Sequence, residues 1–377
     1  MAERKRIGIL CPFGKNWIGG VYYIENLIIG LNHIADELKP IIDLYCLNED
    51  IYNSIQHNTK YPYLDKNLIR LSFIRKGIRR IVSFISYINP LNIWLYKINP
   101  EDIIVYPAYN FRKDNRLIYW IPDLQDKSLP DMFTSEELKR RDKIVENVCK
   151  HNNPIVFSSY DSQNDFYRFY PQFKNNVTYV VHFAVNQLDY SHISIESLKK
   201  QYKIRREYLF CANQFWKHKN HLFLFRVLKK AIDAGFNKQL VCTGNMSDYR
   251  NPEYIQEIKD YISINHLEDY IITLGMIKKE DLYCLMKHSY AVVQPSLFEG
   301  WNTTVEDCKA MSKFVYLSDL KVHREQLNTN VCFFNPYDES DLVNKLLNIK
   351  PTEDKYDYSK SIKQFGEDFY KVIASRL

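Results

Sequence analysis

The stretch Pro295–Glu325 reads PSLFEGWNTTVEDCKAMSKFVYLSDLKVHRE and does most to decide the expected fold. The apolar run Tyr290–Val293 just before it predicts a buried strand, which Pro-Ser ends. A short loop then carries Glu299 and Gly300 ahead of an expected helix. A strand, a carboxylate, a glycine that allows close backbone approach and a helix N-terminus therefore follow one another within a few residues.

This arrangement has two interpretations. The free N–H groups at a helix start favour an anion such as phosphate. A carboxylate beside a phosphate is unfavourable unless it serves another part of the ligand, and the hydroxyl groups of a sugar are a natural candidate. Alternatively, the stretch is an ordinary strand-to-helix connection in which Glu299 is a solvated loop residue. Spacing alone does not separate these interpretations.

The composition is that of a globular protein large enough for two hydrophobic cores. The chain has 377 residues, of which 46% are apolar and 25% charged. Its eight cysteines are scattered without a C-x-x-C pair, which indicates reduced, buried thiols rather than a disulfide framework or a zinc site. The sequence contains no signal-peptide pattern and no apolar run of about 18 residues, so we expect a cytosolic location.

Positive charge gathers in one segment. Between Lys66 and Pro100 there are seven basic residues and no acidic one, although the net charge of the whole chain is +6. Isoleucines recur there at helical spacing, which predicts a helix lying in an anionic membrane interface at the inner face of the cell membrane. The alternative is a domain helix with its apolar face in the core, and no nucleic-acid recognition motif accompanies the segment. The basic side chains between the isoleucines are Arg75, Lys76, Arg79 and Arg80.

Two series of alternating strands and helices predict an α/β protein with two doubly wound parallel sheets. We expect an N-terminal domain over residues 1–185, a polar connection over 186–205 and a C-terminal domain over 206–355. A last helix within 356–377 belongs to neither sheet, and we expect it to pack back on the N-terminal domain. The expected C-terminal strands are Tyr208–Ala212, Gln239–Thr243, Ile271–Leu274, Ala291–Val293, Phe314–Leu317 and Val331–Phe334.

The first expected strand, Arg6–Cys11, leads into a candidate phosphate loop. This loop ends in Gly19 and Gly20, just before a helix expected over Val21–His33. Paired glycines let a diphosphate or a sugar approach the backbone closely. The G-x-G-x-x-G fingerprint is absent, however, and a flexible strand-to-helix turn explains the glycines equally well.

Four loops of the C-terminal domain are expected at one edge of its sheet. Lys217 and Lys219 follow the first expected strand, at a helix entrance where cations pair with phosphate oxygens. Gly244 and Met276 lie in the loops after the next two strands, and Glu299 follows the fourth. Because the carboxyl ends of parallel strands meet at the same edge, all four loops could line one site.

Residues 208–335, and more loosely the whole chain, resemble the retaining GT-B glycosyltransferases of glycosyltransferase family 4. The family pattern E-G-x-G-x-x-x-x-E after P-S-x-x corresponds here to Pro295, Ser296, Glu299, Gly300 and Asp307. The segments NQFWKHKNH, SDLKVHREQ, WIPDLQD and SSYDSQNDFYRFYP are similar to a branch that works on bacterial surface polysaccharides of the lipopolysaccharide O-antigen or capsule type. The resemblance implies two Rossmann-like domains facing across a cleft.

The resemblance also implies a role for each matching position. Glu299 would bind the hydroxyls of the donor sugar and face the reacting carbon, and Lys219 would bind the diphosphate together with the loop at Gly20. Asp307, or the adjacent Glu306, would hold the ribose hydroxyls. Backbone N–H groups would come from Gly300, Trp301, Asn302, Thr303 and Thr304, and the backbone at Met276 and Ile277 would meet the base.

The chain departs from the family pattern at three places. The second acid is Asp307, which is one methylene shorter than the usual Glu, and Gln214 stands where the usual arginine accompanies the lysine. In the first half, the histidines of the H-D-L-Q-H pattern are replaced by Pro122 and Asp126, while Asp123 remains. Asp123 and Asp126 either contact the acceptor or serve as helix caps and loop charges.

The leading hypothesis is a retaining hexosyltransferase that uses a UDP-, GDP- or ADP-sugar and a glycan or lipid-linked glycan acceptor. No D-x-D triplet stands in a suitable loop, so we expect neither a metal ion nor another cofactor. Fixed positive groups and backbone N–H donors would instead stabilise the leaving diphosphate. Two alternatives remain open: a non-catalytic GT-B subunit that binds a glycan or a partner transferase, and a GT-B nucleotide-sugar epimerase.

Overall fold

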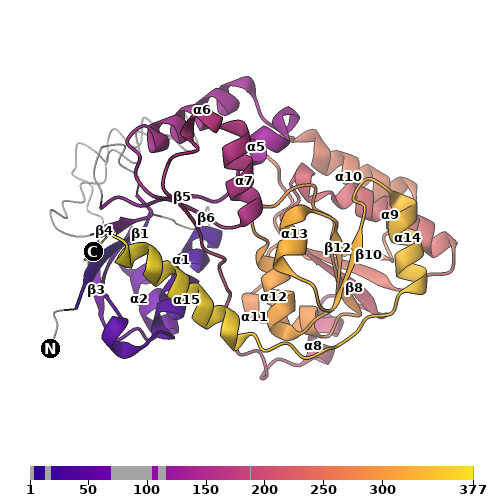
Figure 1. Ribbon diagram of the computed structural model, residues 1–377. Coiled ribbons are helices and arrows are strands. Elements are labelled where there is room, and N and C mark those ends of the chain that lie inside the picture. The colour runs from indigo at the N-terminus through magenta and orange to yellow at the C-terminus, as the bar shows by residue number, and fades with distance from the viewer. Residues whose placement is uncertain (1–3, 13–17, 69–103, 109–115, 187, 377) are drawn as a thin grey trace. The chain divides into compact units, whose positions relative to one another are not determined.

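The computed structural model describes residues 4–12, 18–68, 104–108, 116–186 and 188–376 (Figure 1). The predicted membrane helix, with Arg75, Lys76, Arg79 and Arg80, lies outside the described residues. The chain divides into two compact units. Unit 1 comprises Met1–Pro122, Arg140–Asn186 and Ser359–Leu377, and unit 2 comprises Asp123–Lys139 and Gln187–Tyr358.

Unit 1 is built on parallel strands. Its four-stranded sheet has the order β3-β2-β1-β4, and a second group has the order β5-β6-β7. A parallel bridge between Val105 and Leu117 links β4 to the residues just before β5. The strands are β1 (Arg6–Cys11), β2 (Ile41–Cys46), β3 (Leu64–Leu68), β4 (Ile104–Tyr106), β5 (Tyr119–Ile121), β6 (Ile155–Phe157) and β7 (Thr178–Val180). Strand β3 was not predicted, because its sequence LDKNL lacks a β-type apolar pattern.

Among the described residues of the first half, the helices are α1 (Ile18–Asn32), α2 (Glu49–Thr59), α5 (Gln125–Ser128), α6 (Ser135–Cys149) and α7 (Tyr160–Phe169), with short 3₁₀ turns between some of them. Helix α6 has a capped start. The hydroxyl oxygen of Thr134 accepts from the backbone N–H of Glu137, and the Glu137 carboxylate accepts from the backbone N–H of Thr134.

The prediction that Gly19 and Gly20 end a loop is wrong. Helix α1 begins at Ile18, so both glycines lie in its first turn. Glycine costs a helix about 1 kcal/mol relative to alanine. The apolar face of α1, including Tyr23, Leu27 and Leu31, is buried, and this packing outweighs the local preference of the glycines.

The last helix, α15 (Ser359–Ala374), packs on α1 within unit 1. The two helices touch backbone to backbone, because a Cβ built on Gly366 would lie 2.0 Å from the carbonyl oxygen of Gly30. A side chain at Gly366 would therefore force α1 and α15 apart. Glycine at this crossing brings the end of the chain into the core of unit 1.

Unit 2 contains a six-stranded parallel sheet with the order β10-β9-β8-β11-β12-β13. This is the strand order 3-2-1-4-5-6 of a doubly wound dinucleotide-binding sheet. All six predicted strands are confirmed, with ends that differ by at most one residue. They are β8 (Tyr208–Ala212), β9 (Gln239–Thr243), β10 (Ile271–Thr273), β11 (Ala291–Gln294), β12 (Val315–Ser318) and β13 (Val331–Phe334).

Helices cover both faces of this sheet, and side chains alternate between the two cores (Figure 1). On β8, Leu209 and Cys211 join one core while Tyr208 and Phe210 join the other. The first core is completed by α9 (His221–Asp233), α10 (Glu253–Ile264) and α14 (Glu339–Asn348), and the second by α8 (Ile195–Gln201), α11 (Lys279–Lys287) and α12 (Thr303–Met311). Helix α8 lies inside the polar segment 186–205, which we predicted as the connection between the two domains.

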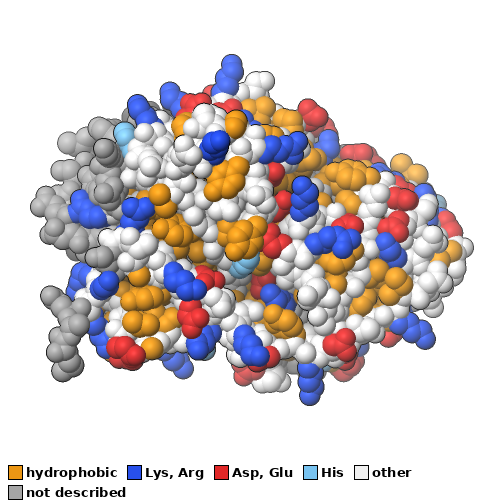
Figure 2. Space-filling model, viewed as in Figure 1, with side chains coloured by type: hydrophobic (Ala, Val, Ile, Leu, Met, Phe, Trp, Pro, Cys, Tyr) orange, Lys and Arg blue, Asp and Glu red, His pale blue; other side chains and the backbone are white. Residues whose placement is uncertain are grey.

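Three further observations bear on the sequence predictions. All eight cysteines are buried free thiols, as expected. Within the described part of the chain, no helix is long and apolar enough to cross a membrane. On the face drawn in Figure 2, basic and acidic side chains are interspersed rather than gathered by sign.

Candidate functional site

The strand order of unit 2 creates a switch point between β8 and β11. From β8 the chain proceeds outward to β9 and β10, and it then returns to the other side of β8 as β11. The loops that leave β8 and β11 therefore run in opposite directions. In doubly wound sheets, this divergence opens the crevice in which ligands bind, outside the carboxyl ends of the strands.

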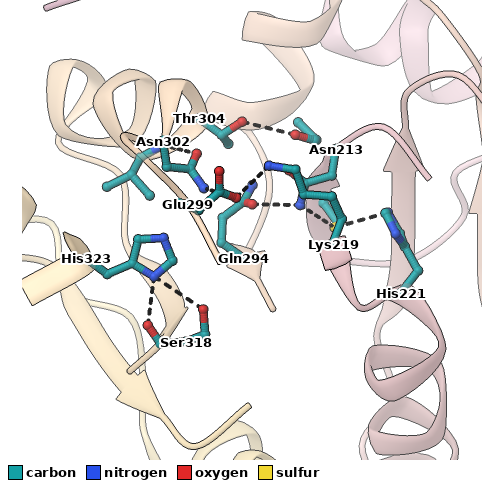
Figure 3. Close-up of polar contacts among 12 residues, drawn as sticks. Asn213, Lys219, His221, Gln294, Glu299, Asn302, Thr304, Ser318 and His323 are labelled. Atoms are coloured by element: carbon teal, nitrogen blue, oxygen red, sulfur yellow. Dashed lines mark hydrogen bonds and ion pairs between the residues drawn. The ribbon is translucent and has the colours of Figure 1, made fainter. Parts of the chain in front are cut away.

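Lys219 and Glu299 meet at this switch point (Figure 3). Lys219 lies in the 3₁₀ turn Lys217–Lys219 after β8, and Glu299 lies in the loop after β11. The Lys219 Nζ atom is 2.5 Å from Glu299 Oε1, and their side chains are only 15% and 9% exposed. The two residues expected at one site thus form a largely buried ion pair.

Several hydrogen bonds hold the two loops together below this ion pair. Asn213 Nδ2 donates to Gln294 Oε1 at 2.7 Å, and both side chains are buried. The backbone N–H of Leu297 donates to the carbonyl oxygen of His218, and the hydroxyl of Thr304 donates to the carbonyl oxygen of Ala212. The relative positions of the Lys219 and Glu299 loops are therefore fixed by backbone and buried side-chain contacts.

Asn302 joins Glu299 to the start of α12. Its Oδ1 atom accepts from the backbone N–H of Val305, which makes Asn302 the N-cap of the helix. Its Nδ2 atom donates to Glu299 Oε1 at 3.0 Å. Glu299 therefore lies beside both a cation and a helix N-terminus, where a negative charge is favoured. The sequence suggested Asn302 as a backbone donor but did not predict this side-chain role.

The loops after β9 and β10 lie against the β8 loop. Gly244 has a φ of +137°, and a Cβ at this position would be 2.0 Å from the carbonyl oxygen of Asn213. Gln214, at the place of the usual arginine, accepts from the backbone N–H of Asn245 and donates to the sulfur of Met276. The side chain of Met276 is 62% exposed, and that of Ile277 is half-buried. These residues share the sheet edge with Lys219 and Glu299.

Glu306 and Asp307 have different surroundings, although they are adjacent on α12. Glu306 accepts from Gln326 Nε2 at 2.9 Å and from the hydroxyl of Tyr358 at 2.5 Å. Asp307 is buried, and burial raises the pKa of its carboxyl to about 7, against the opposing effects of Lys279 and Tyr283. Glu306 is therefore held by hydrogen bonds to Gln326 and Tyr358, whereas burial has the largest effect at Asp307, which also interacts with Tyr283.

The other predicted site residues are distributed as follows. Asp123 Oδ1 accepts from the backbone N–H of Gln125, the first residue of α5. Asp126 is buried in α5. Lys217 is exposed, and its backbone N–H donates to Asp248. Gly300 and Trp301 are buried, while Thr303 is the exposed first residue of α12.

Sequence reasoning assigned no role to His323, which lies next to this site (Figure 3). It belongs to α13 (Lys321–Gln326) and is wholly buried. Its Nδ1 atom is 2.8 Å from the carbonyl oxygen of Ser318, at the end of β12. In the sequence, the segment SDLKVHREQ shows only a family resemblance. A histidine just after the end of a strand is the signal that could have indicated a site residue here.

The candidate site lies in a part of the chain that matches a known protein family. Residues 205–350, which include the Lys219 and Glu299 loops, match the family described as glycosyl transferases group 1. A curated relative is the O-antigen chain mannosyltransferase RfbU of Salmonella typhimurium strain LT2, which is 24% identical over 236 residues. This match covers 62% of the chain and spans 61% of the length of RfbU.

Solved structures share the fold of nearly the whole chain. HepE of Anabaena, solved in complex with UDP and glucose, matches with a TM-score of 0.61 and 14% identity, covering 99% of this chain and 95% of its own. WaaG, a glycosyltransferase involved in lipopolysaccharide biosynthesis, matches with a TM-score of 0.55 and 10% identity, covering 98% and 95%. The chain therefore has the α/β fold of GT-B glycosyltransferases.

Proposed function

We propose that this chain is a retaining glycosyltransferase of family 4 that moves a sugar from a nucleotide sugar to a glycan or lipid-linked glycan acceptor. The observation that carries the proposal is the buried pair of Lys219 and Glu299 at the switch point of unit 2. Two opposite charges held in a ligand crevice provide one group for a diphosphate and one for sugar hydroxyls. The match of this region to group 1 glycosyl transferases supports the same assignment.

Donor binding would exchange the partners of this ion pair. The diphosphate would take Lys219, since an ammonium group binds phosphate oxygens strongly. Glu299 would then accept hydrogen bonds from the sugar hydroxyls, while the N-terminus of α12 would add backbone donors near the phosphates. These groups would stabilise the charge of the leaving diphosphate, so the proposal gives no role to a metal ion.

The acceptor oxygen would bond to the reacting carbon on the face from which the diphosphate leaves. The configuration at that carbon is then retained. Asp123, whose Oδ1 accepts from the backbone N–H of Gln125, would contact the acceptor. The backbone at Met276 and Ile277, at the same sheet edge, would meet the base.

We propose Asp307 rather than Glu306 as the ribose ligand, because Asp307 occupies the second acidic position of the family pattern. Glu306 already bonds Gln326 and Tyr358, so a ribose would have to displace contacts that hold α12 in place. Hydroxyl groups near Asp307 would favour its ionised form by hydrogen bonding. Ribose binding would thus offset the burial that raises its pKa.

The similarity to an O-antigen mannosyltransferase supports a place in cell-surface polysaccharide assembly. A lipid-linked acceptor would be met at the inner face of the cell membrane. The basic segment with Arg75, Arg79 and Arg80 supports peripheral attachment to an anionic surface.

The purified chain tests the proposal directly. It is incubated with UDP-, GDP- and ADP-sugars, with and without isoprenoid diphosphate-linked glycans, and free nucleoside diphosphate and glycan product are measured. We expect one donor class to be consumed with an acceptor and to give a product of retained configuration. Binding of a glycan without consumption of any donor would favour the non-catalytic alternative, and epimerised donor would favour the epimerase.

Membrane attachment is tested separately by vesicle sedimentation. Reversing the charges of Arg75, Arg79 and Arg80 to Glu should lower binding to vesicles that contain anionic lipid by at least tenfold, because each basic residue contributes about 1 kcal/mol. Vesicles of neutral lipid are the control. Equal binding of the reversed and unchanged chains to anionic vesicles would exclude this attachment.

A further inference from the structure

His323 has a fixed tautomer. A carbonyl oxygen only accepts hydrogen bonds, so the 2.8 Å contact with the carbonyl of Ser318 requires the proton to be on Nδ1. In the neutral ring, Nε2 is then an acceptor with a free lone pair. Within the described part of the chain, this Nε2 atom is buried and has no hydrogen-bond partner.

The unpartnered edge of the ring faces the candidate donor site. Figure 3 shows Nδ1 turned to Ser318 and the opposite edge of the imidazole turned towards Glu299. The His323 ring is 0% exposed, so a ligand does not reach it directly. Its effect on the site must therefore pass through the neighbouring charges.

The neighbouring charges have opposite effects on the pKa of His323. Burial lowers the pKa of His323, and the nearby ammonium of Lys219 lowers it further. The carboxylate of Glu299 and the carbonyl of Ser318 raise this pKa, as does the carboxylate of Asp319 to a smaller extent. Burial and the ammonium of Lys219 together outweigh the groups that raise this pKa, so the pKa of His323 lies below its usual value.

Donor binding changes this balance, if the proposed function holds. Lys219 would turn to the diphosphate, and Glu299, which is 9% exposed, would lose its cation. A buried carboxylate without a compensating charge is strongly unfavourable. Asn302 supplies only a neutral donor to Glu299. A proton on Nε2 would restore a positive charge next to this carboxylate.

We propose that His323 takes up one proton at Nε2 when a nucleotide sugar binds and draws Lys219 away from Glu299. The proton comes from solvent and enters the free lone pair, and no covalent bond is broken. His323 is thus a positioning residue that keeps Glu299 ionised while the sugar is held. The assignment rests on the proposed roles of Lys219 and Glu299.

The first test measures protons exchanged on binding. UDP-glucose and GDP-mannose are the probes, because their esterified diphosphates do not titrate near neutral pH. Calorimetry at pH 6.5 in two buffers of different ionisation enthalpy gives the proton number for the wild type and for His323→Asn. Asparagine retains a donor for Ser318 and cannot titrate, so Asp307 contributes equally to both measurements.

We expect the wild type to take up as much as one proton more than His323→Asn. The affinity of the wild type for the nucleotide sugar should therefore fall more steeply with rising pH than that of His323→Asn. The difference should be up to about tenfold for each pH unit across the titration range. Equal proton numbers in the two proteins would overturn the inference while leaving nucleotide-sugar binding, and hence the proposed function, intact.

The second test needs no ligand. Lys219→Met removes the charge that lowers the pKa of His323, so the ring titration, followed by NMR of labelled histidine, should move to higher pH. Lys238→Met, which removes an exposed ion pair with Glu207 elsewhere in unit 2, is the matched control. An unmoved titration in Lys219→Met would overturn the inference. If neither nucleotide sugar binds, the proposed function fails, and this titration still decides whether Lys219 and His323 are coupled.

Discussion

Glu299 and Asp307 occupy the two acidic positions of one sequence pattern, yet their surroundings differ. Glu299 lies in the loop after β11 with an ammonium group 2.5 Å away. Asp307 lies inside α12, where burial raises the pKa of its carboxyl to about 7. The difference shows that the strand order, rather than the spacing of the acids, decides which carboxyl pairs with Lys219. The loop after β11 carries Glu299 to the switch point, where it meets Lys219 from the turn after β8.

The largest expected effect comes from Glu299→Ala. If Glu299 binds the donor sugar, its loss should lower transfer by at least about 10²- to 10³-fold, as removal of one preorganised polar group from a reaction site does. The initial rate of glycan formation measures this effect. Glu207→Ala, which removes an exposed carboxylate of the same unit, should retain the wild-type rate. Full activity in Glu299→Ala with an unchanged melting curve would remove Glu299 from the site.

Removal of Lys219 alone should be the next largest effect. Lys219→Met leaves the Glu299 carboxylate largely buried without its cation, so the free energy of unfolding should fall by about 3 kcal/mol. The double variant Lys219→Met/Glu299→Gln should recover most of this loss, because no buried charge remains. Urea unfolding of the wild type, both single variants and the double variant measures the coupling. Additive losses would show that the two charges do not interact.

Asp307→Asn should stabilise the protein in a pH-dependent way. The pKa of Asp307 is about 7 in the folded chain and near 3.8 when unfolded, so between these values the folded state binds more protons. Wild-type stability from this group therefore falls as the pH rises from about 4 to 7. Asparagine removes this loss, so the stability advantage of Asp307→Asn should grow by about 3 kcal/mol between pH 5 and pH 8. A constant difference in unfolding free energy across that range would contradict the burial of an ionisable Asp307.

Gln326→Ala should give the smallest of these effects. Gln326 Nε2 donates to the carbonyl oxygen of Asn302 and to Glu306, so it links the Glu299 loop to the first turns of α12. Its removal leaves buried acceptors with fewer donors, which costs about 1–2 kcal/mol. The melting temperature should fall, and the apparent KM for the donor should rise because Asn302 is less well held. An unchanged KM would mean that α12 and the Glu299 loop are positioned independently.

Much of unit 2 could be predicted from the sequence, and the reasons are local. Its strands are short apolar runs between turn residues, and parallel pairing brings their ends to one edge. The expected neighbourhood of Gly244, Met276, Lys219 and Glu299 followed from that rule and is present. Whether these residues bind a nucleotide sugar stays a prediction.

The features that could not be predicted depend on tertiary contacts. Helix α1 includes Gly19 and Gly20 because its other residues pack in the core, which local preference does not reveal. The ion pair of Lys219 and Glu299 depends on two loops 80 residues apart in sequence. His323 became visible only when its fixed Nδ1 contact and the charges beside it were known. The segment Asp123–Lys139 was predicted as part of the N-terminal domain, but its tertiary contacts assign it to unit 2.

The glycine crossing of α1 and α15 has a consequence for the order in which the two units can complete their folds. Unit 1 needs residues from both ends of the chain, whereas every residue of unit 2 has been synthesised before α15 begins. Helix α15 is therefore synthesised after the whole of unit 2, and unit 1 closes only once Gly366 can pack on Gly30.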